Sequence, residues 1–222
     1  MTFYDLSHTI AHGTITYKGL PGPIICDYLS REESRKLYAP GTEFQIGKIE
    51  MVANTGTYVD SPFHRYADGK DLAQLSLEKL ADLPGIVVRV EQPGPVAITP
   101  DYFQQIDVAG RAVLVQTNWS RHWGSEAYFE GHPFLTEESA LYLKQAGAVL
   151  VGIDSHNIDD TRGNSRPVHT ILLGAEIPIV EHLTGLDQLP SSPFSFFAVP
   201  PKISGFGTFP VRAFAICKHN HF

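Results

Sequence analysis

A short, turn-rich segment holds the residues whose types and spacing are best suited to chemistry. It reads Asn54-Thr55-Gly56-Thr57-Tyr58-Val59-Asp60-Ser61-Pro62-Phe63-His64, with Asp60 and His64 four residues apart. A carboxylate followed closely by an imidazole can bind a metal ion or act as a general acid–base pair. The purely structural alternative is that Asp60 caps a turn and that His64 packs beside Phe63.

A second imidazole and a second carboxylate occur later in the chain. His169 is expected on a short helix, and Glu181 is expected at the end of a strand 12 residues further on. Strand ends are frequent site positions in α/β proteins. The alternative makes His169 a helix-surface residue and Glu181 a solvated carboxylate. Asp154 also follows an apolar strand, but we favour a role for it in capping the next turn through backbone amides.

Alternating and β-branched runs predict the strands that must position these residues. A short helix is expected after Thr99-Pro100, and a longer one is expected to begin at Thr136 and to stop at Gly147. No repeat or linker is visible, so we expect one domain over residues 1–222. The pattern predicts an α/β or α+β fold with a mixed, partly barrel-like sheet. The expected strands cover residues 5–10, 44–52, 86–90, 112–116, 148–153, 177–180, 194–199 and 211–217.

Composition excludes several classes of protein. The chain has 222 residues and a formal net charge of −7, without a basic run, which argues against nucleic-acid or anionic-membrane binding. No stretch approaches the roughly 20 apolar residues that span a bilayer. Two cysteines are too few for a disulfide framework, and the first residues do not form a signal peptide. We therefore expect a cytoplasmic protein.

Histidines and aromatic residues add weaker signals. Ten histidines suggest metal or acid–base chemistry, although scattered surface imidazoles are the alternative and His219 and His221 are expected in a frayed tail. Four further rings either line a pocket or fill the core, and we expect core for most of them: Trp119, Trp123, Phe129 and Phe134.

These motifs together resemble the cyclase family of metal-dependent hydrolases, whose members include bacterial kynurenine formamidase and isatin hydrolase. The family hallmark reads His-x-Gly-Thr-His-x-Asp-x-Pro-x-His and corresponds here to residues 54–64. The segments Asp5-Leu6-Ser7, Gly152-Ile153-Asp154-Ser155 and 172–183 look like further family motifs in the same order. The resemblance covers nearly the whole chain. It implies a single α/β (α+β) domain whose mixed, partly barrel-like sheet is flanked by helices, similar to the swivelling β/β/α cyclase fold.

The resemblance also implies roles for individual residues. In the family, the hallmark Asp and its first two histidines bind one metal ion, and this chain has Asn54 and Tyr58 at those histidine positions. A second ion's ligands correspond to Asp60, His169 and Glu181. The final hallmark histidine, the proton donor and acceptor of the family, corresponds to His64. Tyr17 lies at the substrate-facing aromatic position, and Asn54 joins it as a predicted substrate-binding residue.

The two missing imidazoles change the expected metal content. An amide oxygen is a weaker ligand than imidazole for Zn²⁺ or Mn²⁺, and a tyrosine with an ordinary pKa near 10 binds such ions well only as phenolate. We therefore predict at most one divalent ion, zinc or manganese, held by Asp60, His169 and Glu181. A metal-free pocket, in which Tyr58 and His64 do the acid–base work, is the alternative.

The function that the resemblance implies is hydrolysis of a small amide or lactone. Metal-assisted attack by water, with His64 as the proton shuttle, is the expected mechanism. A metal-independent isomerase, dehydratase or cyclase on the same scaffold is one alternative, because a fold does not fix a reaction. A non-catalytic small-molecule binding protein is another. The expected partners are a small-molecule substrate and further copies of the chain in a homodimer or homotetramer, with no nucleic acid and no membrane.

Overall fold

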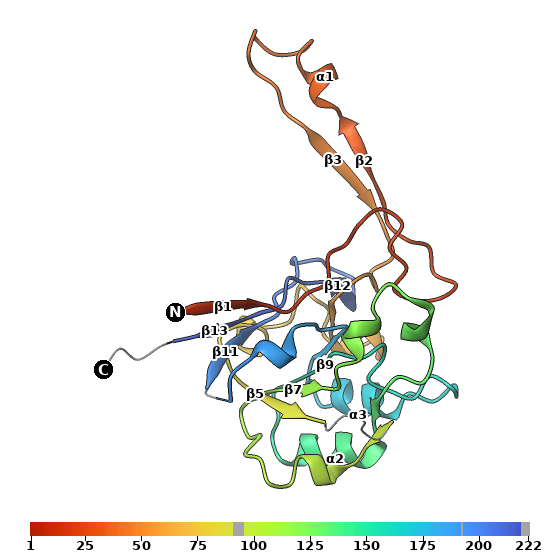
Figure 1. Ribbon diagram of the computed structural model, residues 1–222, viewed down its shortest axis with the longest axis vertical. Coiled ribbons are helices and arrows are strands. Elements are labelled where there is room, and N and C mark those ends of the chain that lie inside the picture. The colour runs from red at the N-terminus through yellow and green to blue at the C-terminus, as the bar shows by residue number, and fades with distance from the viewer. Residues whose placement is uncertain (91–95, 192, 219–222) are drawn as a thin grey trace.

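The computed structural model describes residues 1–90, 96–191 and 193–218, and a nine-stranded mixed sheet forms its centre (Figure 1). His219 and His221 lie outside the described residues. In spatial order the strands are β1 (Thr2–Asp5), β13 (Phe214–Cys217), β11 (Phe194–Phe197), β5 (Leu83–Arg89), β7 (Ala112–Gln116), β9 (Leu150–Ile153), β10 (Ile179–Glu181), β4 (Tyr58–Asp60) and β12 (Thr208–Pro210).

Four parallel strands make up the middle of this sheet. β5, β7, β9 and β10 run parallel, and antiparallel strands extend the sheet on both sides. Strand β7 is buried along its whole length, as its run of apolar residues predicts for a strand covered on both faces. The sheet curls into a half-barrel, so the predicted mixed and partly barrel-like sheet is confirmed.

Two helices cover one face of the parallel strands. Helix α2 (Glu137–Gln145) begins at Thr136, whose hydroxyl accepts a hydrogen bond from the Ser139 amide at 3.3 Å, as the sequence predicts. Helix α3 (Pro167–Gly174) packs beside α2, and both contribute to one of the two hydrophobic clusters of the core. The other cluster combines residues of the parallel strands, such as Leu114, with residues of the antiparallel strands, such as Val59 and Phe196.

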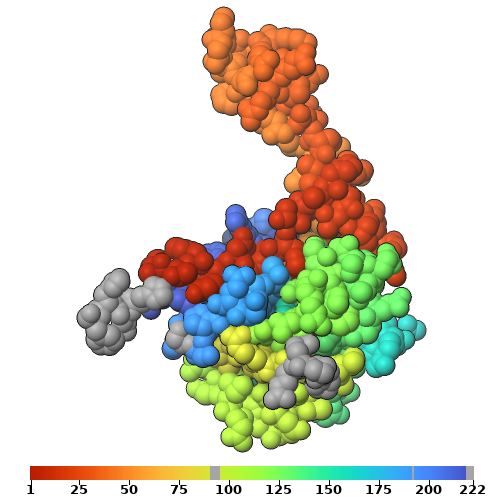
Figure 2. Space-filling view, in the orientation of Figure 1, coloured from red at the N-terminus to blue at the C-terminus, as the bar shows by residue number. Residues whose placement is uncertain are grey.

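A hairpin arm projects from the body of the molecule (Figures 1 and 2). It consists of β2 (Ile24–Leu29), the single-turn helix α1 (Arg31–Ser34) and β3 (Ile46–Glu50), and β2 pairs only with β3. Its surface is unusually apolar for a feature that is surrounded by solvent. The exposed apolar side chains of the arm are Ile24, Ile25, Tyr28, Leu37, Tyr38, Phe44, Ile46 and Ile49.

Several sequence predictions need correction. The strand expected over residues 5–10 ends at Asp5, because the chain then leaves the sheet and only Ser7 keeps an isolated bridge, to Leu183. The strand expected over 44–52 narrows to β3 and lies in the arm instead of the main sheet. The helix expected after Thr99 is a single 3₁₀ turn, Pro100–Tyr102. Five strands had no prediction: β2 in the arm and the short strands β4, β12, β6 (Ala97–Ile98) and β8 (Phe134–Leu135).

Close backbone packing holds the segment around His64 in place. A Cβ atom on Gly207, just before β12, would lie 2.4 Å from the His64 backbone nitrogen and 2.5 Å from its Cα. The Gly207 carbonyl also accepts a hydrogen bond from the Ser61 amide at 2.7 Å. Within the described ranges, no helix is both long enough and apolar enough to cross a membrane.

We therefore expect Gly207→Ala to destabilise the protein by about 1–3 kcal/mol, as overpacking against rigid backbone typically does. Urea unfolding followed by circular dichroism measures the change. Gly163→Ala is the matched control, because a Cβ there meets no atom within 4 Å. Equal stability of the two variants would contradict this account of the packing.

Candidate metal and catalytic site

The pairing of three short strands places the first site residues on one face of the sheet. Strand β4 lies between β10 and β12, and its register sets Tyr58 opposite Glu181 and Asp60 opposite Thr208. Opposed residues of antiparallel strands project to the same face, and so do residues two apart on one strand. Tyr58, Asp60, Glu181 and Thr208 are consequently neighbours although they come from three distant parts of the sequence.

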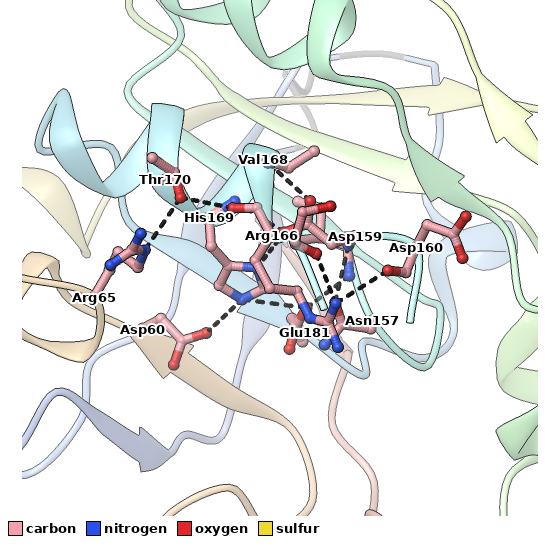
Figure 3. Close-up of polar contacts among 12 residues, drawn as sticks. Asp60, Arg65, Asn157, Asp159, Asp160, Arg166, Val168, His169, Thr170 and Glu181 are labelled. Carbon is pink, nitrogen blue, oxygen red and sulfur yellow. Dashed lines mark hydrogen bonds and ion pairs between the residues drawn. The ribbon is translucent and has the colours of Figure 1, made fainter. Parts of the chain in front are cut away.

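Asp159 fixes the position of His169 at the start of helix α3. One carboxylate oxygen of Asp159 accepts from the Val168 amide at 2.8 Å, and the other accepts from the His169 amide at 3.0 Å and from His169 Nδ1 at 2.6 Å. This carboxylate caps α3 in place of Arg166, the N-cap residue, whose side chain makes no capping bond. Because Nδ1 is engaged, His169 presents Nε2 to the strands, where it lies 3.6 Å from Asp60 Oδ2 and 3.7 Å from Glu181 Oε1 (Figure 3).

The donor atoms around His169 Nε2 fit a single divalent cation. Asp60 is fully buried, and its Oδ2 atom has no hydrogen-bond partner among the described residues. A buried carboxylate oxygen without a partner is costly unless a cation neutralises it. Asp60, His64 and His169 each place a ligand-type atom within 4.8 Å of the others. An imidazole whose other nitrogen bonds a carboxylate is the usual arrangement of a metal-binding histidine.

In the absence of an ion, His169 itself supplies positive charge to this cluster. Burial alone would lower its pKa, but the hydrogen bond to Asp159, the neighbouring Asp60 and the charge of Glu181 raise the pKa to about 10. Burial raises the pKa of Glu181, and the nearby Asp60 charge adds to that shift. The two buried carboxyl groups, Asp60 and Glu181, thus share the positive charge of a single imidazole, that of His169.

Thr208 orients His64. The Thr208 hydroxyl donates to Asp60 Oδ1, and it lies 2.8 Å from His64 Nδ1. Because the only proton of that hydroxyl goes to Asp60, His64 Nδ1 must carry a proton and donate it to Thr208. The lone pair of neutral His64 is then on Nε2, and about a third of this side chain is exposed. His64 is therefore set up to accept a proton at Nε2.

Two tyrosine hydroxyls surround the second oxygen of Glu181. Tyr58 Oη donates to Glu181 Oε2 at 2.5 Å, and Tyr17 Oη lies 2.7 Å from Tyr58 Oη and 3.2 Å from the same carboxylate oxygen. Burial, together with the Glu181 charge, raises the pKa of Tyr58 well above 10. In this arrangement the phenol keeps its proton and donates it to Glu181, whereas a tyrosine binds such ions well only as phenolate.

A buried ring cluster continues the network behind Tyr17. His182 Nε2 lies 3.2 Å from Tyr17 Oη, and His182 Nδ1 lies 2.8 Å from Tyr128 Oη. Burial lowers the pKa of His182 well below 6.5, so its ring is neutral and bridges the two phenols. His182 also has a φ of 56°, a left-handed backbone conformation that is rare for residues with a side chain.

These residues surround a cavity of about 270 Å³, a size suited to a small molecule. Of the residues predicted from sequence, the cavity is lined by Tyr17, Asn54, Tyr58, His64, His169 and Glu181, with Asp60 beneath it. The structure thus brings the whole predicted set together, while the individual catalytic, metal-binding and substrate-binding roles stay predictions. Neither His169 nor Glu181 is a solvated surface residue, since they are 6% and 0% exposed.

Other predictions about this region were less accurate. Asp154 does hold a turn, but it is the turn after β7: its carboxylate accepts from the amides of Thr117 and Asn118, at 2.6 and 2.8 Å. Among the four aromatic residues expected mostly in the core, only Phe134 is buried, while Trp119, Trp123 and Phe129 are half-buried. Trp123 packs beside His182, Phe129 beside His156 and Trp119 beside His122, and none of these three rings belongs to either hydrophobic cluster.

Sequence reasoning missed several residues of the site. The missed residues are Arg65, Tyr128, Asn157, Asp159, Arg166, His182 and Thr208. His182 directly follows the predicted Glu181, and Asp159 precedes the predicted helix of His169, so proximity in sequence was a usable signal for these two. No pattern in the sequence singles out Thr208, because its contact with His64 depends on the pairing of β12 with β4.

Comparisons with known proteins identify the family of this chain. Residues 4–160 match the family model described as "Putative cyclase". A kynurenine formamidase of Geobacillus thermodenitrificans is 33% identical over 171 residues, which are 76% of this chain and 78% of that protein. A kynurenine formamidase of Bacillus cereus is 27% identical over 214 residues, or 94% of each chain.

Solved structures share the fold over almost the whole chain. A structure titled as a potential metal-dependent hydrolase with cyclase activity superposes with a TM-score of 0.78 at 26% identity, covering 96% of each chain. An isatin hydrolase bound to thioisatinate gives a TM-score of 0.82 at 22% identity, covering 96% of this chain and 91% of that one. The protein belongs to the cyclase family, and the fold predicted from its motifs is confirmed.

The double substitution Asn54→His with Tyr58→His tests whether the loop keeps the family geometry. It adds two imidazoles beside Asp60 and removes the hydroxyl that donates to Glu181 Oε2. Because imidazole suits Zn²⁺ and Mn²⁺, we expect a gain of about one metal equivalent per chain by mass-spectrometric metal analysis. Tyr58→Phe is the control, since it removes the hydroxyl without adding a ligand. A folded double variant without extra metal would show that the loop has left the family geometry.

Proposed function

We propose that the protein is a metal-dependent hydrolase that cleaves a small amide or lactone with a single divalent ion, zinc or manganese. The observation that carries this proposal is the unpartnered, fully buried Asp60 Oδ2 beside His169 Nε2. The relatives named kynurenine formamidase support an amide substrate, and the family match supports the hydrolase class. No feature of the described site favours the metal-independent alternatives.

Asp60, His169 and Glu181 are the proposed ligands. Glu181 Oε1 accepts from the Ile158 amide at 2.6 Å, and Oε2 accepts from Tyr58, so both oxygens are held in fixed positions. A divalent ion supplies Lewis-acid polarisation of a carbonyl group and makes water more acidic. Two carboxylates and one imidazole form a donor set of the kind found in catalytic zinc sites.

His64 moves the proton in this proposal. Thr208 keeps the proton on Nδ1, so Nε2 accepts a proton from water and then donates it to the leaving nitrogen or oxygen. Tyr58 holds Glu181 through its hydroxyl. The Tyr17 ring and Asn54 line the cavity, where they contact the substrate.

Metal analysis and kinetics of three variants test these assignments. We expect one metal equivalent in the wild type, none in His169→Ala, and affinity weakened about 10–100-fold in Asp159→Asn, because partners behind a ligand typically matter by that factor. We expect His64→Ala to keep its metal and to lose about 10²–10⁴-fold in kcat on a small amide or lactone that the wild type hydrolyses.

Other results would contradict specific parts of the proposal. Two tightly bound equivalents in the wild type would mean that Asn54 and Tyr58 act as ligands. Loss of metal from His64→Ala would mean that His64 is a ligand. Its position allows this, because ligand-type atoms of Asp60, His64 and His169 all lie within 4.8 Å of one another. The exposed His12→Ala is the control for general effects of removing an imidazole.

We also propose that the protein is a cytoplasmic homodimer or homotetramer whose arm packs against a second copy. Eight exposed apolar side chains on one narrow hairpin form a surface that a monomer leaves in water, which is typical of an interaction site. The low cysteine content supports a reducing compartment, and both cysteines are free thiols. A net charge of −7 supports a small-molecule substrate over nucleic acid or an anionic membrane.

Light scattering after size exclusion tests the arm. We expect the double variant Tyr28→Ser with Ile49→Ser to shift the assembly toward monomer, because it removes two side chains that are 74% and 57% exposed in the single chain. The control is Leu77→Ser, whose side chain is also exposed but lies on the body of the protein. An unchanged mass for the arm variant would place the interface elsewhere.

A further inference from the structure

Two arginines line the cavity of the candidate site. Arg65 follows the 3₁₀ turn Pro62–His64, Arg166 precedes α3, and both line the same cavity as His64 and His169 (Figure 3). Within the residues that the structure describes, neither has a carboxylate at ion-pair distance. Four others do, at 3.2 Å or less: Arg35, Arg111, Arg162 and Arg212.

Each of the two guanidinium groups is anchored along one edge only. Arg65 Nε donates to Thr170 Oγ1 at 3.1 Å, and Thr170 Oγ1 in turn donates to the Arg166 carbonyl at 2.7 Å. Arg166 Nη1 donates to the carbonyls of Asp160, Gly163 and Ser165 at 3.2, 2.8 and 2.6 Å. The remaining N–H groups have no hydrogen-bond partner among the described residues and are available for a ligand: Nη1 and Nη2 of Arg65 and Nε and Nη2 of Arg166.

These two guanidinium groups lack a carboxylate partner although the protein is acidic. The chain has seven more carboxylates than cationic side chains, yet none lies at ion-pair distance from Arg65 or Arg166 among the described residues. Arginine presents a planar pair of donors that matches a carboxylate, and anchoring one edge in advance reduces the entropy lost when the other edge binds. Local positive charge also raises the concentration of an anion at the cavity.

We propose that Arg65 and Arg166 bind a carboxylate group of the substrate, away from the bond that is cleaved. This inference rests on the proposed hydrolase function and narrows its substrate class to small amides or lactones that carry an acid group. The cavity of about 270 Å³ fits one such molecule with its scissile carbonyl toward Asp60 and His169 and its acid group toward the arginines.

Binding of a compound that cannot be hydrolysed tests the arginine pair separately from turnover. The probes are 3-phenylpropionate and its neutral counterpart 3-phenylpropan-1-ol, titrated into the metal-loaded protein by calorimetry. We expect Arg65→Gln and Arg166→Gln each to weaken binding of the acid about tenfold, as loss of one charge-assisted hydrogen bond does, and to leave binding of the alcohol unchanged. Arg65→Lys keeps the charge and should recover part of the loss.

The matched control is Arg162→Gln. Arg162 lies in the same loop as Arg166, but it pairs with Asp160 at 2.7 Å and lines a different cavity. All variants keep the metal ligands, so coordination of the acid by the ion is common to all of them. The inference is overturned if wild-type protein binds the acid no better than the alcohol. It is also overturned if the two cavity variants match Arg162→Gln, which would mean that the arginines only balance the buried carboxylates.

Turnover of a matched pair of amides completes the test. We expect the wild type to prefer N-formylphenylalanine over N-formylphenylalaninamide in kcat/KM, and the Arg65→Gln and Arg166→Gln variants to lose that preference, because each loses more kcat/KM on the acid than on the neutral amide. Equal preference in wild type and variants overturns the inference. If neither amide is hydrolysed although the acid binds through the arginines, the anion site stands and the proposed hydrolysis of such amides fails.

Discussion

Two carboxylates that are completely removed from solvent determine how the rest of the site is built. Asp60 and Glu181 are 0% exposed and approach the same atom, His169 Nε2, to 3.6 and 3.7 Å. Burying two like charges together is expensive unless hydrogen bonds and positive charge compensate them. The neighbouring residues supply this compensation unevenly: Asp60 Oδ2 has no hydrogen-bond partner among the described residues, and the proposed cation would compensate this oxygen.

The two buried carboxylates receive different numbers of hydrogen bonds. Glu181 receives neutral donors, the Ile158 amide and the Tyr58 and Tyr17 hydroxyls, whereas Asp60 receives one hydroxyl, from Thr208. The resemblance to the family implies that imidazoles at positions 54 and 58 would bind a further ion. Here the phenol of Tyr58 donates its own proton to Glu181. The Tyr58 hydroxyl therefore supplies part of the compensation that this buried carboxylate needs.

The same need for compensation links the site to the scaffold. Asp159 caps helix α3 and orients His169, so the start of a packed helix and the geometry of a ligand depend on one carboxylate. The Thr208 hydroxyl contacts both Asp60 and His64, and the pairing of β12 with β4 brings it to that position. In consequence, the proposed ion site and the proposed proton shuttle are not independent: a change in strand register would disturb both at once.

The sequence by itself determined the strands with continuous apolar runs, the capped helix α2 and, through its motifs, the family. It also determined which residue types replace the family histidines, because Asn54 and Tyr58 stand in an otherwise regular pattern. Only the tertiary structure decided what Tyr58 does, because its partner Glu181 is 123 residues away and comes opposite it through the pairing of β4 with β10. The three-residue strands β4 and β12 escaped prediction for the same reason: so short a segment has no periodicity of its own, and its extended shape comes from the hydrogen bonds of its neighbours.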